Sequence, residues 1–191
     1  AEQVNKFYER QLQEDRSNGN QCMYLAVVPA SGQARPNTNP VMEFIMEKGL
    51  QDRTFGIFSK CDENSDADVL RALTLNEKTE EDDEPAVTLG GVELPNGWVT
   101  TMQKPPNGEH FKYHNFERMY LQQKQEAEWF QNPDLPERKQ HWQRLLEKKT
   151  AGIADLVPRV QKMYLAHLQS FWKEHAMLQI FEKEASTEFH L

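Results

Sequence analysis

Cysteine is scarce in this sequence of 191 residues: there are only two, Cys22 and Cys61, and neither belongs to a CxxC pair or to a Cys–His motif. This scarcity excludes a disulfide-stabilised mini-protein and indicates a reduced, intracellular compartment, whether cytosolic, organellar or associated with a membrane. No run approaches the roughly 18 apolar residues that a membrane-spanning helix needs, so an integral membrane protein is also excluded. The chain begins with Ala1 and carries no signal-peptide or transit-peptide pattern, and we expect that an upstream segment has been removed.

Basic residues are also in deficit, because 22 Lys and Arg stand against 30 Asp and Glu, which gives a net charge of −8. A nucleic-acid-binding protein gains affinity by neutralising phosphates, so no nucleic-acid partner is expected. Apolar residues make up only 38% of the chain and the mean hydropathy is −0.82. This composition favours long amphipathic helices around a modest core.

Six of the acidic residues are concentrated in the eight residues from Glu77 to Glu84. Like charges in a block repel one another and stay hydrated, so the pattern predicts a solvated acidic insertion over residues 77–97. The other interpretation is that a basic partner binds the block between Glu77 and Glu84.

Hydrophobic periodicity predicts helices that alternate with short strands. Helices are predicted around residues 4–12, 41–48, 67–73, 111–130, 142–146 and 156–178, and strands around residues 22–28, 53–59 and 98–102. The first two strands are nearly continuous apolar runs, which is typical of strands buried on both faces of a parallel sheet. The last helix contains Pro158, which a helix tolerates in its first turn. The order of elements predicts an α/β fold, with a partial parallel sheet of about three strands followed by long amphipathic helices.

Four residues directly after the second predicted strand carry the clearest chemistry: Ser59, Lys60, Cys61 and Asp62. Open parallel sheets bind ligands beyond the carboxyl ends of their strands. A [TNS]-K-x-D sequence in that place is how GTPases recognise guanine, because the Asp accepts hydrogen bonds from the ring N–H and the exocyclic amine while the Lys stem covers the base. The alternative is structural, with Lys60 a surface lysine and Asp62 a helix N-cap.

The wider sequence resembles the dynamin family. Residues 24–30 (YLAVVPA) and 53–62 (RTFGIFSKCD) are similar to that family's LAVxPA strand and its RTxGVxTKxD strand, and residues 98–104 resemble its fifth GTPase motif. Residues 126–133 (EAEWFQNP) are similar to the family's E-x-x-FF-x-x-P segment. Gly152 and the helix after it resemble the run that leaves the GTPase domain for the helical bundle. The resemblance covers residues 12 to about 182.

This resemblance implies that residues 1–108 are the C-terminal half of a dynamin-like GTPase domain and that residues 109–191 lead into a helical bundle. It implies that Ser59, Lys60 and Asp62 belong to the guanine motif for GTP or GDP, in which Lys60 and Asp62 select the base, and that Gln103 and Lys104 flank the ribose. The chain departs from the family's usual Thr at Ser59, Leu at Cys61 and Asn-Arg pair at 103–104.

The sequence of 191 residues contains neither a GxxxxGK[ST] phosphate-binding loop nor a DxPG segment. We therefore identify no catalytic residue and expect no GTP hydrolysis from this sequence alone. Mg²⁺ is expected only where a P-loop-bearing segment completes the site. Two functions remain: a non-catalytic remnant that serves as a structural subunit of a larger assembly, or a piece of an active GTPase whose hydrolysis drives membrane remodelling. In both, a protein partner is expected to cover the open edge of the sheet, and any membrane association is indirect.

Other candidate sites are weaker. His110 and His114 have the i, i+4 spacing of a zinc-binding pair, but Phe111 stands where the catalytic Glu of such a site belongs and no third ligand is placed. Surface histidines and no metal site are therefore expected. Cys61 is expected to be a packed thiol, because no base is placed to make it a nucleophile.

Overall fold

The computed structural model divides the chain into two units, residues 24–160 and residues 1–23 with 161–191. It describes residues 2–17, 19, 22–30, 35–63, 66–79, 85–87, 89–102, 116–132, 138–171 and 177–178. The unit of residues 24–160 holds the sheet and the candidate site.

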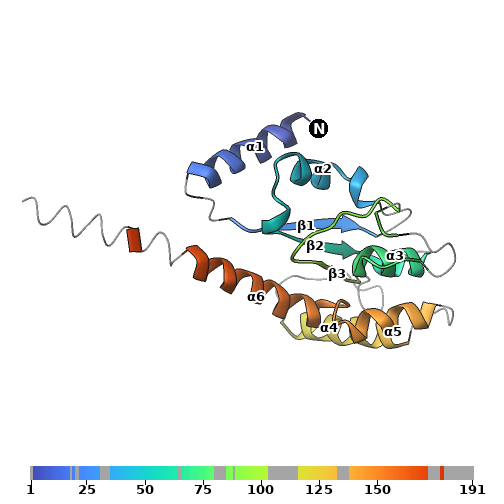
Figure 1. Cartoon of the computed structure of the whole chain (residues 1–191). Coiled ribbons are helices and arrows are strands. Elements are labelled where there is room, and N and C mark those ends of the chain that lie inside the picture. The colour runs from blue at the N-terminus through green and yellow to red at the C-terminus, as the bar shows by residue number, and fades with distance from the viewer. Residues whose placement is uncertain are drawn as a thin grey trace, which may run out of the picture. The chain divides into compact units, whose positions relative to one another are not determined.

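A parallel sheet of three strands, in the order β1-β2-β3, forms the centre of this unit (Figure 1). The strands are β1 (Tyr24–Pro29), β2 (Thr54–Ser59) and β3 (Trp98–Thr100). Tyr24 lies opposite Thr54, and Gly56 lies opposite Trp98. The strands coincide closely with the predicted apolar runs, and the predicted α/β class is confirmed.

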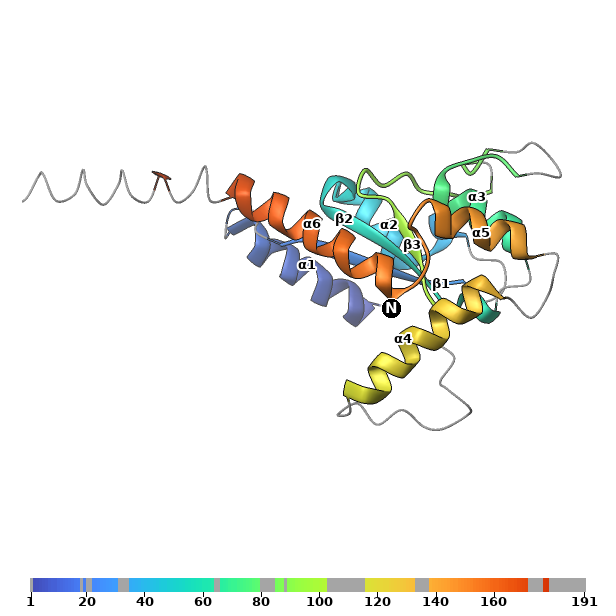
Figure 2. The ribbon, with the colours of Figure 1, turned by 90° about the horizontal axis from the view of Figure 1, so that it is seen from below.

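Helices connect the strands. Between them lie α2 (Pro40–Glu47) and α3 (Ala67–Leu75), and after them come α4 (Phe116–Gln131), α5 (Lys139–Glu147) and α6 (Ile153–Phe171), with short 3₁₀ turns η1 (Pro36–Thr38), η2 (Gln51–Arg53) and η3 (Cys61–Glu63). Two of these helices have a side-chain N-cap. The Asn39 side chain accepts the N–H of Val41 at the start of α2, and the Asp66 carboxylate accepts the N–H of Val69 at the start of α3. The helix α3 packs against β3 and α5, and α4 packs against α5 (Figures 1 and 2).

The core is built on the central strand. All six residues of β2 are buried, as expected for a strand with a neighbour on each side. Phe58 of β2 stacks on Trp98 of β3, with ring centroids 4.5 Å apart. A second aromatic cluster joins α4 to α5, where Trp142 lies 5.4 Å from Trp129 and 5.6 Å from Phe130 between ring centroids.

One face of β1 is exposed, so the prediction that this strand is buried on both faces was wrong. Ala26 and Val28 are buried, whereas Leu25 and Val27 are 50% and 48% exposed. Side chains on a face of a strand are buried by segments that pack over that face, and β1 makes its principal contacts within the described part of the chain with its strand neighbour β2 rather than with a helix.

The predicted acidic insertion is not wholly solvated. Thr79, Ala86 and Leu94 are buried, and residues 78 and 85 form an antiparallel bridge. The chain on either side of residues 80–84 therefore packs onto the unit, while residues 80–84 themselves lie outside the described residues.

Two helices, α4 and α6, differ in detail from the prediction. The described part of α4 begins at Phe116, and residues 111–115 lie outside the description. Pro158 was expected in the first turn of its helix. Because α6 begins at Ile153, Pro158 lies beyond that turn. The proline removes the hydrogen bond to the carbonyl of Ala154, and both residues are exposed, so water can hydrate that carbonyl.

The other unit contains α1 (Glu2–Ser17), as the periodicity predicted, and the part of α6 from residue 161 onward. In the last turn of α1 the Asp15 carboxylate accepts the N–H of Cys22 at 2.7 Å, and this bond holds the segment that follows the helix. None of the described helices combines the length and the apolar character that crossing a lipid bilayer requires.

Candidate functional site

The tetrapeptide of residues 59–62 lies at the carboxyl end of the central strand and contains a bulge. The N–H of Thr101 donates to the carbonyl of Phe58 at 2.7 Å, which continues the pairing of β2 with β3. The next carbonyl, that of Thr101, accepts the N–H of Cys61 at 3.1 Å, whereas a regular parallel ladder would use the N–H of Lys60. Lys60 is thus one extra residue in the ladder, and its φ of 60° places it in the left-handed region.

This bulge separates the side chains of the 59–62 tetrapeptide into two sets. Ser59 and Cys61 are buried, whereas Lys60 and Asp62 are partly exposed. The Lys60 Nζ lies 3.7 Å from the Glu63 carboxylate. The bulge therefore leaves Lys60 and Asp62 partly accessible at the end of the sheet, with the Lys60 ammonium beside the Glu63 carboxylate.

The structural interpretation of Asp62 as the N-cap of the following helix was wrong. The carboxylate that caps α3 belongs to Asp66, which accepts the N–H of Val69 at 3.0 Å. Asp62 instead lies within η3, close to the strand end. The position of Asp62 is thus explained by the bulge rather than by the helix.

Burial raises the pKa of the Cys61 thiol well above its usual value, and the nearby Glu126 and Asp62 carboxylates raise it further. The thiol Sγ lies 3.4 Å from the carbonyl of Phe58. Cys61 is therefore a protonated, packed thiol, as predicted, and its backbone N–H anchors the bulge.

Two of the predicted site residues, Gln103 and Lys104, lie outside the described residues. Thr101 and Met102, which directly precede them, are described and buried. The structure thus places Lys60 and Asp62, partly exposed, at the end of β2, buries Ser59, and places the residues that follow β3 beside them through the bond from Cys61 to Thr101.

Sequence reasoning gave Glu126 no role at this site. The residue is 1% exposed, and its Oε1 accepts the N–H of Met102 at 2.8 Å while its Oε2 accepts the N–H of Ile153 at 2.6 Å. Burial raises the pKa of this carboxyl, and the two backbone bonds oppose that shift. Two sequence signals mark it: it is the first residue of the segment 126–133 that resembles the family's E-x-x-FF-x-x-P, and it lies four residues before Phe130, on the apolar face of the same helix.

Stability should fall with pH because of Glu126. Its pKa is higher in the folded protein, so its contribution is fully present below the ordinary glutamate pKa and is lost as pH rises through the folded value. We expect Glu126→Gln to lack this dependence, so the urea midpoint of the wild type relative to the variant should decrease from about pH 4 upward. Glu128→Gln, an exposed change on α4, is the control. A difference between wild type and Glu126→Gln that stays constant with pH would contradict the prediction.

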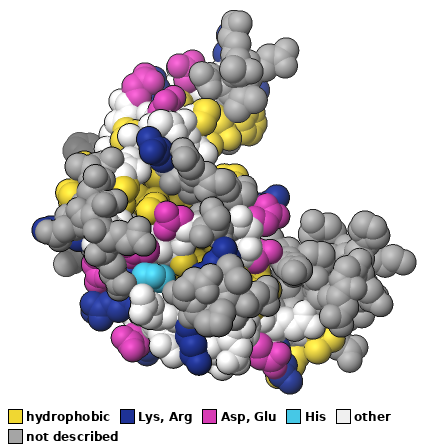
Figure 3. Space-filling view, turned by 90° about the vertical axis from the view of Figure 1, so that its right-hand side faces the viewer, with side chains coloured by type: hydrophobic (Ala, Val, Ile, Leu, Met, Phe, Trp, Pro, Cys, Tyr) yellow, Lys and Arg dark blue, Asp and Glu magenta, His cyan; other side chains and the backbone are white. Residues whose placement is uncertain are grey.

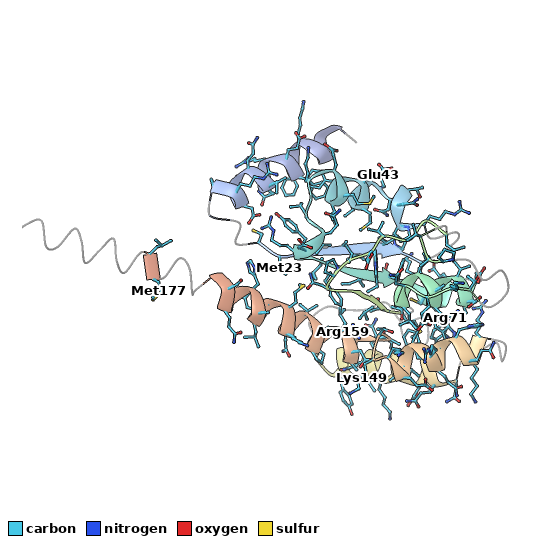
Figure 4. The ribbon with its side chains drawn as sticks, in the orientation of Figure 1. Met23, Glu43, Arg71, Lys149, Arg159 and Met177 are labelled. Carbon is cyan, nitrogen blue, oxygen red and sulfur yellow. The ribbon has the colours of Figure 1, made fainter. Side chains whose placement is uncertain are left out.

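An ion-pair cluster joins α3 to α5. The side chain of Arg71 is 7% exposed and donates to Asp68 at 2.6 Å and to Glu77 at 2.8 Å, and Arg144 of α5 donates to the other Glu77 oxygen at 3.1 Å. Figure 4 shows Arg71 where α3 lies along α5. The first residue of the acidic block thus has basic partners within the same chain.

An open pocket of about 220 Å³ lies beside this cluster and is lined by Arg71, Gln140, Gln143, Arg144 and Glu147. Both arginines already donate to carboxylates, so the pocket offers an anion little net positive charge. Figure 3 looks onto the side toward which the strands run, and its described acidic and basic side chains are interspersed. Among the described residues, no group of three or more His, Cys, Asp or Glu side chains could hold a metal ion.

Replacing Lys60 by Gly should stabilise the fold and, if Lys60 covers guanine as the family resemblance implies, weaken the binding of guanine nucleotide. Glycine adopts a φ of 60° without the steric cost that a side chain incurs, so a gain of about 1 kcal/mol in the free energy of unfolding is expected. Lys149→Gly is the matched control, because Lys149 has a φ of 54° and follows α5 (Figure 4). Urea unfolding should show the gain in both variants, and only Lys60→Gly should lose affinity for guanine nucleotide. Equal affinity in the two variants would show that the Lys60 side chain has no binding role.

No protein-family model matches this chain, and no curated protein matches its sequence. The dynamin-like resemblance therefore stays a prediction from the motifs.

Proposed function

We propose that residues 24–160 form the guanine-recognition half of a dynamin-like nucleotide-binding domain, in which Lys60 and Asp62 recognise the base. The observation that carries this proposal is the bulge at Lys60. It turns Lys60 and Asp62 out of the core at the end of the central strand, while Cys61 is tied to the carbonyl of Thr101. Ligands of open parallel sheets bind at this end.

The chemistry of the two side chains suits guanine. The Asp62 carboxylate would accept hydrogen bonds from the ring N–H and the exocyclic amine of guanine, and adenine lacks this pair of donors. The stem of Lys60 would cover one face of the base. Ser59 is buried, and we assign it to packing of the strand end.

The two edges of the sheet differ. Beyond β3, Thr100 donates to the carbonyl of Thr150 at 2.9 Å and accepts the N–H of Gly152 at 2.7 Å, so the chain itself pairs with that edge. Beside β1, no described strand pairs with the outer edge, and Leu25 and Val27 are half exposed. We propose that a strand from a P-loop-bearing segment pairs there and supplies the phosphate and Mg²⁺ contacts for GTP hydrolysis, with α6 leading into a helical bundle.

The second candidate is a non-catalytic structural subunit of a larger assembly. The exposed Leu25 and Val27 favour it, because an apolar edge strand suits a protein partner whether or not nucleotide is bound. In this case the 59–62 tetrapeptide would be a vestige, and its departure from the family motif at Ser59 and Cys61 would reflect the loss of nucleotide binding.

Nucleotide titration separates the two candidates. The chain would be titrated with fluorescent GDP, alone and joined to a P-loop-bearing upstream segment, and GDP and ADP would then be added as competitors. Competition by GDP but not by ADP, lost in Asp62→Ala, supports guanine recognition and contradicts the structural candidate. Absence of guanine binding in both forms of the protein would overturn the proposed function.

A further inference from the structure

A single peptide group, the one between Thr101 and Met102, is hydrogen-bonded on both sides. Its carbonyl accepts the N–H of Cys61 at 3.1 Å, and its N–H donates to Glu126 Oε1 at 2.8 Å. Cys61 lies between Lys60 and Asp62, so this peptide group connects the Glu126 carboxylate to the 59–62 tetrapeptide. Hydrogen bonds in such a chain polarise and strengthen one another.

The second carboxylate oxygen bonds to a different part of the chain. Glu126 Oε2 accepts the N–H of Ile153, the first residue of α6, at 2.6 Å. Gly152 directly before it has a φ of +87°, and a Cβ at this position would lie 3.2 Å from Oε2. Glycine therefore lets the start of α6 come close to the carboxylate, which also lies favourably at the positive end of the helix dipole.

A neutral side chain of the same shape could not make both bonds. A carboxylate accepts at both oxygens, whereas the amide of a glutamine accepts at its oxygen and donates at its nitrogen. Burying the carboxylate disfavours its charged form, as its raised pKa shows. The charge of Glu126 also acts on Cys61, since it raises the pKa of that thiol.

We propose that Glu126 is a positioning residue for guanine recognition: by holding the 101–102 peptide group it holds the N–H of Cys61, and so the orientation of Lys60 and Asp62. The same carboxylate ties this arrangement to the first turn of α6. The proposal rests on the proposed function, because it gives Glu126 a part in selecting the base.

Base selectivity tests this role. Hypoxanthine lacks the exocyclic amine of guanine, so the ratio of the affinities for GDP and inosine diphosphate reports how well Asp62 is placed. One charge-assisted hydrogen bond predicts a ratio of about 10 or more for the wild type, and Glu126→Gln should lower it at least about threefold. Glu128→Gln, the exposed change on the same helix, should leave the ratio unchanged. A purely structural role would lower the folded fraction and both affinities together, without changing their ratio.

Amide chemical shifts supply a readout without nucleotide. Glu126→Gln should shift the amide resonance of Cys61 as well as those of Met102 and Ile153. Should that variant fail to fold, Glu126→Asp keeps the carboxylate but shortens its reach, and should change the same resonances and the same ratio. If the folded variant keeps the guanine selectivity of the wild type, or if its Cys61 amide resonance does not shift, the role of Glu126 is overturned and the proposed function is not. Absence of guanine binding in the wild type overturns the proposed function and this role with it.

Discussion

If Asp62 recognises guanine as proposed, replacing it by Asn should change the base preference of this protein from guanine to xanthine. In the proposed role the aspartate would accept two N–H groups of guanine, whereas an asparagine would turn one of its two groups into a donor that faces the exocyclic amine. Xanthine carries a carbonyl in place of that amine and would accept this donor. Two charge-assisted bonds are lost or weakened, so the affinity for GDP should fall about 100-fold or more while that for xanthosine diphosphate rises.

The measurement is competition of GDP and xanthosine diphosphate against one fluorescent nucleotide. Asp66→Asn is the matched control: it makes the same chemical change four residues away, and because asparagine caps helices as well as aspartate, α3 should be retained. If Asp62→Asn keeps the preference of the wild type for GDP, Asp62 does not recognise the base.

Replacing Gly56 by Ala should have the largest effect on stability. Gly56 is buried in the central strand, and a Cβ there would overlap the indole ring of Trp98. That ring has little freedom to move, since it stacks on Phe58 at 4.5 Å and its Nε1 donates to the carbonyl of Val92 at 2.9 Å. Overpacking of this kind should lower the free energy of unfolding by about 3 kcal/mol, measured by urea denaturation.

Two further variants test the cause of this loss. Gly49→Ala meets no atom within 4 Å but has a φ of +65°, so it should cost only the backbone penalty of about 1 kcal/mol. A smaller residue at position 98 should relieve the overlap, so Gly56→Ala combined with Trp98→Leu should be less destabilised than the sum of the two single changes. Strict additivity would show that the indole ring is not what excludes a side chain at residue 56.

The secondary structure of the sheet was predictable because it depends on local patterns. The run from Thr54 to Ser59 is apolar and β-branched over a short length, and it forms the buried central strand. The position of residues 59–62 at the end of a strand was predictable for the same reason, because they directly follow that run. The role of Glu126 was not, since its two partners lie 24 and 27 residues away in the sequence.

The sequence by itself determined the order of helices and strands, the parallel α/β class and the place of Lys60 and Asp62 at a strand end, because periodicity and strand length are local properties. Only the tertiary structure decided that β1 leaves Leu25 and Val27 exposed, since burial depends on which segments pack beside a strand. It also decided that Lys60 forms a bulge and that Glu126 links the end of β3 to α6. Those features arise from hydrogen bonds between segments far apart in the chain, which no local pattern encodes.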